Sequence, residues 1–287
     1  EFRRVLFRSR DQTVIPLEIL VIDQTPEPGR DLNIAQEFSD LPLRWFNLDQ
    51  AGQCSSRNFG LQYSTGDYIL FIDDDDEIPP DLIEAHLNCL SEYHCNVSCG
   101  VAIETGVGSL PPDFTFIRTS DVFPTNNTMI NRKVLYISGL FDLAYDHGQR
   151  ADHDLGMRIY LAGEKMVLNP EIKVIHHHAP SGGLREHKAR VITYASSRQS
   201  YTQRHLLSVS DVYLAMRYFS RRQVDELIWL SVLGSFSRKG SVLQITLKVI
   251  TSLFLLPHSI YILARNKKLA EKMLKHFPQI PKLDDHL

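Results

Sequence analysis

Cysteine is scarce in this sequence, with four residues among 287 and no Cys-x-x-Cys pair. A small secreted scaffold held by disulfides would need more, so reduced thiols of a cytosolic protein are the better interpretation. Three of the cysteines (Cys89, Cys95 and Cys99) lie near His86 and His94, but their spacing fits no standard zinc pattern. A structural zinc site is therefore disfavoured.

A marked excess of either charge is also missing, because the formal net charge of the whole chain is −3. The balance hides an asymmetry: residues 200–287 hold 13 Lys and Arg against 6 Asp and Glu, and residues 1–199 hold 18 against 28. Hydrophobic residues at 43% and charged residues at 23% are typical of a globular protein. An acidic body followed by a basic, apolar C-terminal part indicates two different roles.

Long apolar runs are missing except in residues 241–264, which just reach the roughly 20 residues of a membrane span. Gln244, Lys248 and Pro257 interrupt this window, so a helical hairpin or an amphipathic pair lying in the membrane interface is favoured over a clean span. The alternative is a buried helix of the globular body followed by a solvated basic tail. A basic segment that suits an anionic cytoplasmic leaflet follows the window: Arg265, Lys267, Lys268, Lys272 and Lys275.

What the chain does have is a run of four carboxylates, Asp73–Asp76, directly after an apolar stretch at residues 68–72. The apolar stretch predicts a buried strand, and Pro79-Pro80 prevents that strand from continuing. Adjacent acids repel one another, and a divalent cation with oxygen ligands would relieve the repulsion. The alternative is a solvated acidic turn at the start of the helix expected near Asp81.

The pattern of apolar residues and turn signals predicts an α/β fold with a mostly parallel sheet and flanking helices. Strands are expected at residues 17–23, 43–46, 68–72, 97–103, 114–118 and 167–174. Helices are expected at residues 55–64, 81–93, 133–137, 152–163 and within 189–237. Residues 1–9 show no periodicity and resemble the translation of a sequencing-library adapter, so we treat them as non-native and give them no part in the fold.

An ordered set of motifs resembles the bacterial family 2 glycosyltransferases over residues 14–187. The motifs are Val21-Ile-Asp23, Ser56-Arg-Asn-Phe-Gly60, Gly66-Asp-Tyr-Ile-Leu-Phe-Ile-Asp-Asp-Asp-Asp76, Asn126-Asn127, Gly139-Leu-Phe-Asp142, Asp152-His-Asp-Leu-Gly-Met-Arg158 and His176 with Gly182-Gly183. The resemblance implies a Rossmann-like GT-A domain at residues 10–188. The aromatic, apolar and basic pattern beyond it predicts a helical, membrane-associated region at 189–287. Family members begin with a strand ending in Pro-Thr-Tyr-Asn or similar, so the first strand is expected to be missing here.

The resemblance also assigns the acidic run. Asp73 and Asp75 match the family's Asp-x-Asp motif, which implies that Asp75 ligates Mn²⁺ or Mg²⁺ while Asp73 and Asp74 lie nearer the ribose and the metal's waters. Asp76 is then equally compatible with a structural role. His176 matches a lone histidine that completes the metal shell or touches the diphosphate, and a hydrogen-bonded loop histidine is the alternative.

Two further residues match donor contacts of the family. Asp23 matches the acid that binds the nucleobase, and Arg57 matches a contact to the diphosphate or base. The alternatives are a strand-end acid that stabilises the next turn and a surface salt bridge. Gln24-Thr25 stand where the family more often has Asp-Gly-Ser, which leaves the base specificity open.

Asp152 matches the family's general base, which takes the proton of the acceptor hydroxyl, although Ala151 stands where a Glu is usual. As a helix N-cap alone, Asp152 would be structural. Asp154 is either the true base or a partner of Arg158 four residues on. Asn127 is placed with these two residues on the acceptor side.

The resemblance implies an inverting, metal-dependent transfer of a sugar from a nucleotide-diphospho donor to a hydroxyl of a polysaccharide or lipid-linked glycan. The expected location is cytoplasmic, peripheral at the inner leaflet of the cytoplasmic membrane, and no nucleic-acid partner is expected. A nucleotidyltransferase or a non-catalytic module that binds sugar nucleotides or divalent cations stays open. A nucleotidyltransferase would, however, need a Gly-rich phosphate loop near the N-terminus, and this sequence shows none.

Overall fold

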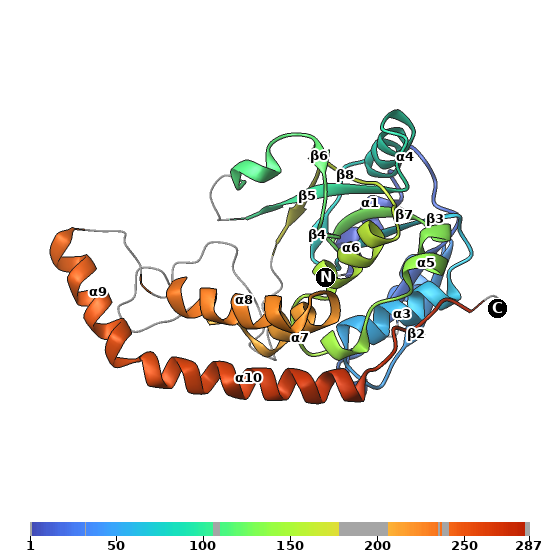
Figure 1. The fold of residues 1–287 in the computed structure, drawn as a ribbon. Helices are drawn as coiled ribbons and strands as arrows, with labels where there is room; N and C mark the ends of the chain where they lie inside the picture. The colour runs from blue at the N-terminus through green and yellow to red at the C-terminus, as the bar shows by residue number, and fades with distance from the viewer. Residues whose placement is uncertain are drawn as a thin grey trace. The chain divides into compact units, whose positions relative to one another are not determined.

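The computed structural model describes residues 2–31, 33–105, 110–177, 206–234, 236 and 241–284 (Figure 1). The chain divides into two compact units. Unit 1 comprises Glu1–His147, Ala151–Glu186 and Ile280–Leu287, and unit 2 comprises Gly148–Arg150 and His187–Gln279. The Gly182-Gly183 loop of the family motif and the first part of the predicted 189–237 helical stretch lie outside the described residues.

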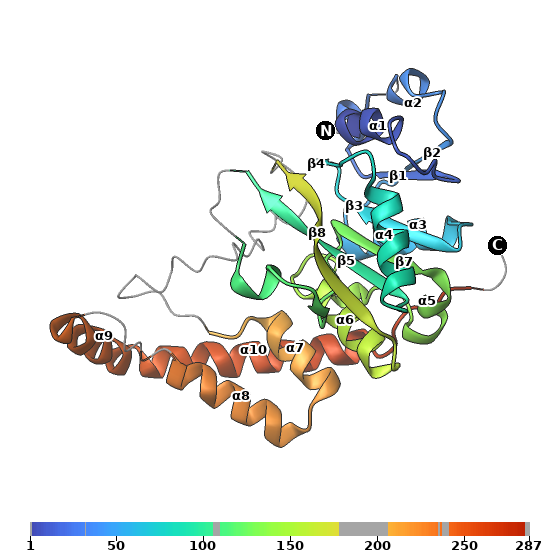
Figure 2. The same cartoon turned by 90° about the horizontal axis from the view of Figure 1, so that it is seen from above.

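The N-terminal part of unit 1 is a small parallel sheet of β1 (Ile19–Asp23) and β2 (Leu43–Asn47). Beside it lie α1 (Phe2–Ser9) and the short α2 (Ile34–Glu37), as Figure 2 shows. Leu6 of α1 is fully buried in a core shared with residues of both strands and α2. Giving residues 1–9 no part in the fold was therefore wrong, because apolar residues at positions 2, 5 and 6 have the spacing of one helix face.

The main sheet of unit 1 is mixed. Its strands are β3 (Tyr68–Ile72), β7 (Asn127–Asn131), β5 (Val97–Glu104), β8 (Met166–His176) and β4 (Asp76–Glu77), in that order, with β6 (Arg118–Thr119) paired to β8. Among the described strands of this sheet, β5 and β8 alone pair in parallel, and the other pairs are antiparallel. The expectation of a mostly parallel sheet fails because β7, which the sequence did not predict, runs antiparallel between β3 and β5.

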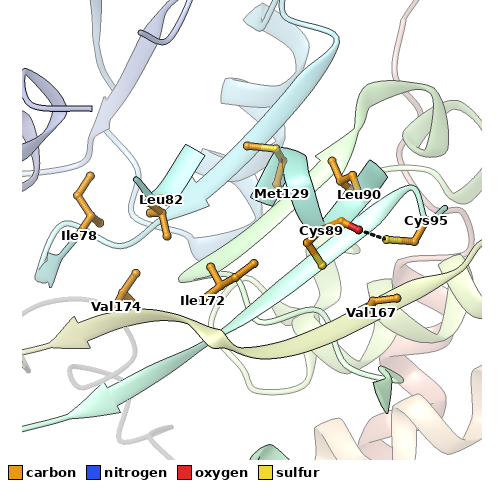
Figure 3. Packing of buried hydrophobic residues seen from close by; sticks show 9 residues of the cluster. All are labelled: Ile78, Leu82, Cys89, Leu90, Cys95, Met129, Val167, Ile172 and Val174. Atoms are coloured by element: carbon orange, nitrogen blue, oxygen red, sulfur yellow. Dashed lines mark hydrogen bonds between the residues drawn. The ribbon is translucent and has the colours of Figure 1, made fainter. Parts of the chain in front are cut away.

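Helices of unit 1 follow the strands and cover the sheet: α3 (Gln53–Tyr63), α4 (Leu82–Glu92), α5 (Arg132–Ser138) and α6 (Ala151–Leu161). Figure 3 shows the core under α4, where Leu82, Cys89 and Leu90 of the helix meet Met129 of β7 and Val174 of β8. All four cysteines are buried free thiols, so they act as small apolar residues here. The strand predicted at 114–118 is instead a short helical turn, η2 (Pro112–Phe114), followed by the two-residue β6.

Unit 2 is helical among its described residues. Its helices are α7 (Val209–Tyr218), α8 (Arg221–Gly234), α9 (Val242–Phe254) and α10 (Leu256–His276). Within the described part of the chain, no single helix meets the length and hydropathy of a membrane span, whereas α9 and α10 meet them together across a bend of 57°. The predicted 241–264 window is thus two helices joined at a break, with Pro257 in the first turn of the second.

Candidate active site

The acidic run forms a turn that brings carboxylates to the end of β8. β3 ends at Ile72, the chain turns, and Asp76 then pairs with His176 in the antiparallel β4–β8 ladder. Asp74 is exposed at the turn, whereas Asp75 and Asp76 are buried. β3 itself is only partly buried, with Phe71 as its one buried residue, so the predicted buried strand is not observed. The burial of Asp75 and Asp76 nevertheless concentrates negative charge where solvent screens it poorly.

Asp76 holds this turn together. One of its carboxylate oxygens accepts a hydrogen bond from the Asp73 backbone N–H at 3.0 Å, and the other lies 2.9 Å from Nδ1 of His176. The same Nδ1 lies 3.3 Å from Oδ1 of Asp75. The hydrogen bond to Asp76 raises the pKa of His176, and burial raises the pKa of Asp76. Asp76 therefore has the structural role that the sequence left open.

Asp73, Asp75 and His176 each offer a ligand atom, and these atoms lie within 4.8 Å of one another. Burial raises the pKa of Asp73 to about 7, and the neighbouring carboxylates of Asp76 and Asp75 add to the effect, while Arg57 opposes it. A divalent cation would favour the ionised form of such a group. The two carboxylates suit Mn²⁺ or Mg²⁺, and the imidazole nitrogen of His176 is a ligand for a transition-metal ion such as Mn²⁺, so these residues fit the predicted ion.

His177, the next residue along the chain, contacts a different carboxylate. His177 Nε2 lies 3.0 Å from Oε2 of Glu77, and its backbone N–H donates to the Asp75 carbonyl at 3.1 Å. Consecutive strand residues point to opposite faces, which is why only His176 of the pair joins the acidic turn. His178 lies outside the described residues.

Arg57 on α3 faces the acidic turn. Its Nη2 lies 3.7 Å from Oδ1 of Asp73, its Nη1 donates to Gln53 at 3.2 Å, and its guanidinium lies 5.6 Å from the ring centre of Phe141. The positively charged guanidinium of Arg57, beside the candidate metal ligands, is well placed to bind phosphate oxygens. Arg57 is therefore brought to the same place as Asp73, and its partner is an acid of the site instead of a remote surface group.

Two residues that the sequence did not single out fix the position of α3. Oδ1 of Asp146 accepts hydrogen bonds from the backbone N–H groups of Cys54 and Ser55, so it caps the helix. The side chain of Asn58 exchanges two hydrogen bonds of 2.8 Å with the backbone of Phe141. Asn58 belongs to the Arg-Asn motif, so the sequence did contain a signal that could have identified it. Asp146 lies 92 residues from Cys54, and no motif near it predicts that it caps α3.

Asp23 lies buried at the end of β1, and its Oδ1 accepts a hydrogen bond from the Thr25 backbone N–H at 2.8 Å. This contact is the turn-stabilising role weighed as the alternative to a base contact. The side chain of Gln24 donates to the carbonyls of Gln50 and Gly52, so it ties the same turn to the residues before α3.

The two acids at the start of α6 have different environments. Asp152 is 39% exposed and lies 2.9 Å from Nδ1 of His153. Asp154 is 0% exposed and binds the guanidinium of Arg158 at 2.7 and 3.0 Å. The partner role predicted for Asp154 and Arg158 is confirmed, and the alternative of Asp154 as acceptor base does not fit a side chain that no acceptor can reach.

Asn127 does not fit the acceptor side either. It is fully buried, its Oδ1 lies 2.9 Å from Nε2 of His86, and its Nδ2 donates to the carbonyls of Val101 and Ile172 at 3.1 Å. All three partners of the amide lie in the protein interior, on β5, β8 and helix α4. A residue of the Asn126-Asn127 motif was assigned to the acceptor side wrongly, because its partners lie far away in sequence.

Comparison with known proteins finds similar sequences for the N-terminal half of the chain. Residues 1–139 match the family described as glycosyl transferase family 2. The glycosyltransferase GlyA of Streptococcus pneumoniae is 33% identical over 102 residues, which cover 34% of this chain and 14% of GlyA. EpsH of Bacillus subtilis is 32% identical over 105 residues, which cover 36% of this chain and 30% of EpsH. The match thus spans less than a third of each of these relatives.

The fold has solved counterparts as well. Residues 1–349 of TarS from S. aureus in complex with UDP-GlcNAc superpose with a TM-score of 0.56 at 14% identity, over 94% of this chain and 86% of that chain. TarS 1–349 without that ligand gives a TM-score of 0.58 at 14% identity, over 96% and 87%. The chain therefore shares its fold with these TarS structures, and its residues 1–139 match glycosyl transferase family 2.

Proposed function

We propose that the protein transfers a sugar, with inversion, from a nucleotide-diphospho donor to a hydroxyl of a polysaccharide or lipid-linked glycan. The observation that supports this most is the cluster of Asp73, Asp75 and His176 beside Arg57 in a family 2 domain. Asp73, Asp75 and His176 would hold Mn²⁺ or Mg²⁺, which when bound supplies positive charge to the diphosphate that leaves. Arg57 binds oxygens of the same diphosphate.

In the proposed reaction Asp152 is the general base. Its carboxylate takes the proton of the acceptor hydroxyl, the hydroxyl oxygen forms a bond to the anomeric carbon, and the bond from that carbon to the diphosphate oxygen breaks. Its position in the first turn of α6 supports this role, because helix N–H groups and the helix dipole stabilise the ionised form. Asp23, through its place at the end of β1, and the exposed Asp74 are proposed to contact the nucleoside.

We also propose that unit 2 docks the protein on the anionic inner face of the cytoplasmic membrane, where lipid-linked acceptors lie. The support is an outward-facing apolar stripe along α9, formed by Leu243, Leu247, Ile250 and Phe254, whose exposed fractions run from 44% to 85%. Exposed basic residues of α10, including Arg265 and Lys268, give the same region a positive charge.

The experiment that tests the transfer incubates the purified protein with Mn²⁺ or Mg²⁺ and UDP-, GDP- and dTDP-sugars. UDP-GlcNAc comes first in the panel because TarS was solved with it. A glycosyltransferase should release a nucleoside diphosphate slowly by hydrolysis and faster once the acceptor is supplied. Formation of a nucleoside triphosphate and a sugar 1-phosphate when pyrophosphate is added would favour a nucleotidyltransferase, and binding of the sugar nucleotide without any reaction would favour a non-catalytic module.

A further inference from the structure

The pairing of β5 with β8 is interrupted at one place. Cys99 pairs with Leu168 and Val101 with Lys173, so the single residue Gly100 on β5 stands opposite the four residues 169–172 of β8. Beyond this bulge the ladder continues to the pair of Glu104 and His176. The bulge therefore decides which residue of β8 reaches the acidic turn.

One side chain closes the bulge. Nδ2 of Asn127, on the adjacent strand β7, donates to the carbonyl of Val101, the first β5 residue past the bulge, and to that of Ile172, the last bulged residue of β8. A Cβ atom on Gly100 would collide with this amide nitrogen and with the Ile172 carbonyl, so only glycine leaves the amide its place. The amide thus substitutes for ladder hydrogen bonds that the bulge disrupts.

The amide is itself held in one orientation. Because both Nδ2 hydrogens go to carbonyls, Oδ1 of Asn127 must accept, and the group facing it is Nε2 of His86 at 2.9 Å. His86 therefore carries its proton on Nε2, and its Nδ1 accepts from the Ser98 hydroxyl at 2.8 Å. His86, Ser98 and Asn127 are all fully buried, so every member of this network has a partner without water.

We propose that Asn127, oriented by His86, is a positioning residue that sets the register of the last part of β8 and so places His176 against Asp75 and Asp76. Ile172 lies four residues before His176, roughly 13 Å along a strand. A slip of one residue would present Ile175 or His177 to Asp76 instead, on the opposite face of the strand. This inference rests on the proposed role of His176 as a metal ligand.

The test is a double-mutant cycle with Mn²⁺ alone as the probe. Mn²⁺ affinity is measured by electron paramagnetic resonance for the wild type, Asn127→Ala, His176→Ala and the double variant. If Asn127 acts through His176, Asn127→Ala weakens Mn²⁺ binding roughly 10- to 100-fold in the wild type and by no more than about twofold in the His176→Ala background. Equal weakening in both backgrounds would overturn the inference, because it would show a general structural effect.

Further variants distinguish a positioning effect on Mn²⁺ binding from a loss of folding. Gly100→Ala keeps every polar group and should also weaken Mn²⁺ binding, while His86→Gln, which can still donate to Asn127, should bind Mn²⁺ better than His86→Leu. Thr128→Val removes the buried hydrogen bond from the next residue of β7 to the Pro124 carbonyl, so it should lower the melting temperature and leave Mn²⁺ affinity unchanged.

The outcomes distinguish an incorrect metal site from an incorrect positioning role of Asn127. Wild-type protein that does not bind Mn²⁺, or His176→Ala that binds it normally, would overturn the proposed metal site and the positioning role with it. Normal His176-dependent Mn²⁺ binding in folded Gly100→Ala and His86→Leu would overturn the positioning role alone.

Discussion

The acidic turn of unit 1 buries charged residues, whereas helix α9 of unit 2 exposes apolar ones. In the turn, the carboxylates of Asp75 and Asp76 are buried at the end of a strand. Along α9, Leu243 and Phe254 are exposed while Ser252 is buried. Buried charge and exposed apolar surface are both costly in water unless something binds there. This contrast supports the two proposed partners, a cation with a diphosphate at the acidic turn and a lipid surface at α9.

If this division is right, Asp75→Ala should give the largest effect. Loss of a central ligand should reduce sugar transfer by at least about a thousandfold, because the diphosphate charge would no longer be neutralised. Initial rates with saturating donor measure the loss, and vesicle binding of the same variant should be unchanged. Asp121→Asn, a surface acid that is 82% exposed, serves as the control. Wild-type rates from Asp75→Ala would contradict the assignment.

Asp152→Asn comes next. Removing the general base should lower kcat by roughly 10²- to 10⁴-fold with little change in the KM for the donor, since Asp152 is proposed to contact only the acceptor. The kcat and KM values over a range of donor concentrations separate these effects.

Asp154→Asn should reduce stability, in contrast to Asp152→Asn, which should reduce kcat. It breaks the buried pair with Arg158, so we expect a loss of about 3 kcal/mol in the free energy of unfolding. Urea unfolding measures this loss. If Asp154→Asn stayed fully stable and lost activity as Asp152→Asn does, the roles of the two acids would be reversed.

Some parts of the fold and of the candidate site could be predicted from the sequence, and others could not. β3 and its acidic turn were predictable because an apolar run, four acids and two prolines are local signals. The pair of Asp154 and Arg158 was predictable for the same reason, since four residues make one helical turn. Asn127 was misassigned because its partners His86 and Ile172 lie 41 and 45 residues away, and no local pattern identifies them.

The same distinction explains the errors in the fold. β7 is five residues long with polar residues at both ends, so it lacks the apolar run that marks a strand. Missing it also hid the mixed character of the sheet, because strand direction depends on pairing between distant segments. In α1, Phe2 and Leu6 carry the helix periodicity in too few residues to stand out before the core they fill is known.

Acid should destabilise unit 1 through His86. Burial lowers the pKa of His86 to about 4, from an ordinary value of 6.5. Between those values the unfolded chain binds a proton that the native state excludes. The free energy of unfolding should therefore fall by about 3 kcal/mol as the pH drops from about 6.5 to about 4. Urea unfolding across this range measures it, and His86→Gln should lack this contribution. An unchanged slope in that variant would assign the acid sensitivity to other groups.

The smallest effect should come from the apolar stripe of α9. Replacing Leu243 and Ile250 together by Glu should weaken binding to vesicles of anionic phospholipid by at least about tenfold, because both side chains would leave the membrane interface. Co-sedimentation measures the binding. Gln244→Glu adds charge beside the stripe and keeps the helix cap, so it is the control. Hydrolysis of a soluble donor should stay at the wild-type rate in all three forms.

The acidic turn is proposed to bind the diphosphate through a cation, and nucleoside diphosphate release measures this role directly. With the matching donor, release should require Mn²⁺ or Mg²⁺, stop on addition of EDTA, and be absent in Asp75→Ala under every condition. Release that continues at the same rate in EDTA, or that survives in Asp75→Ala, would contradict the account.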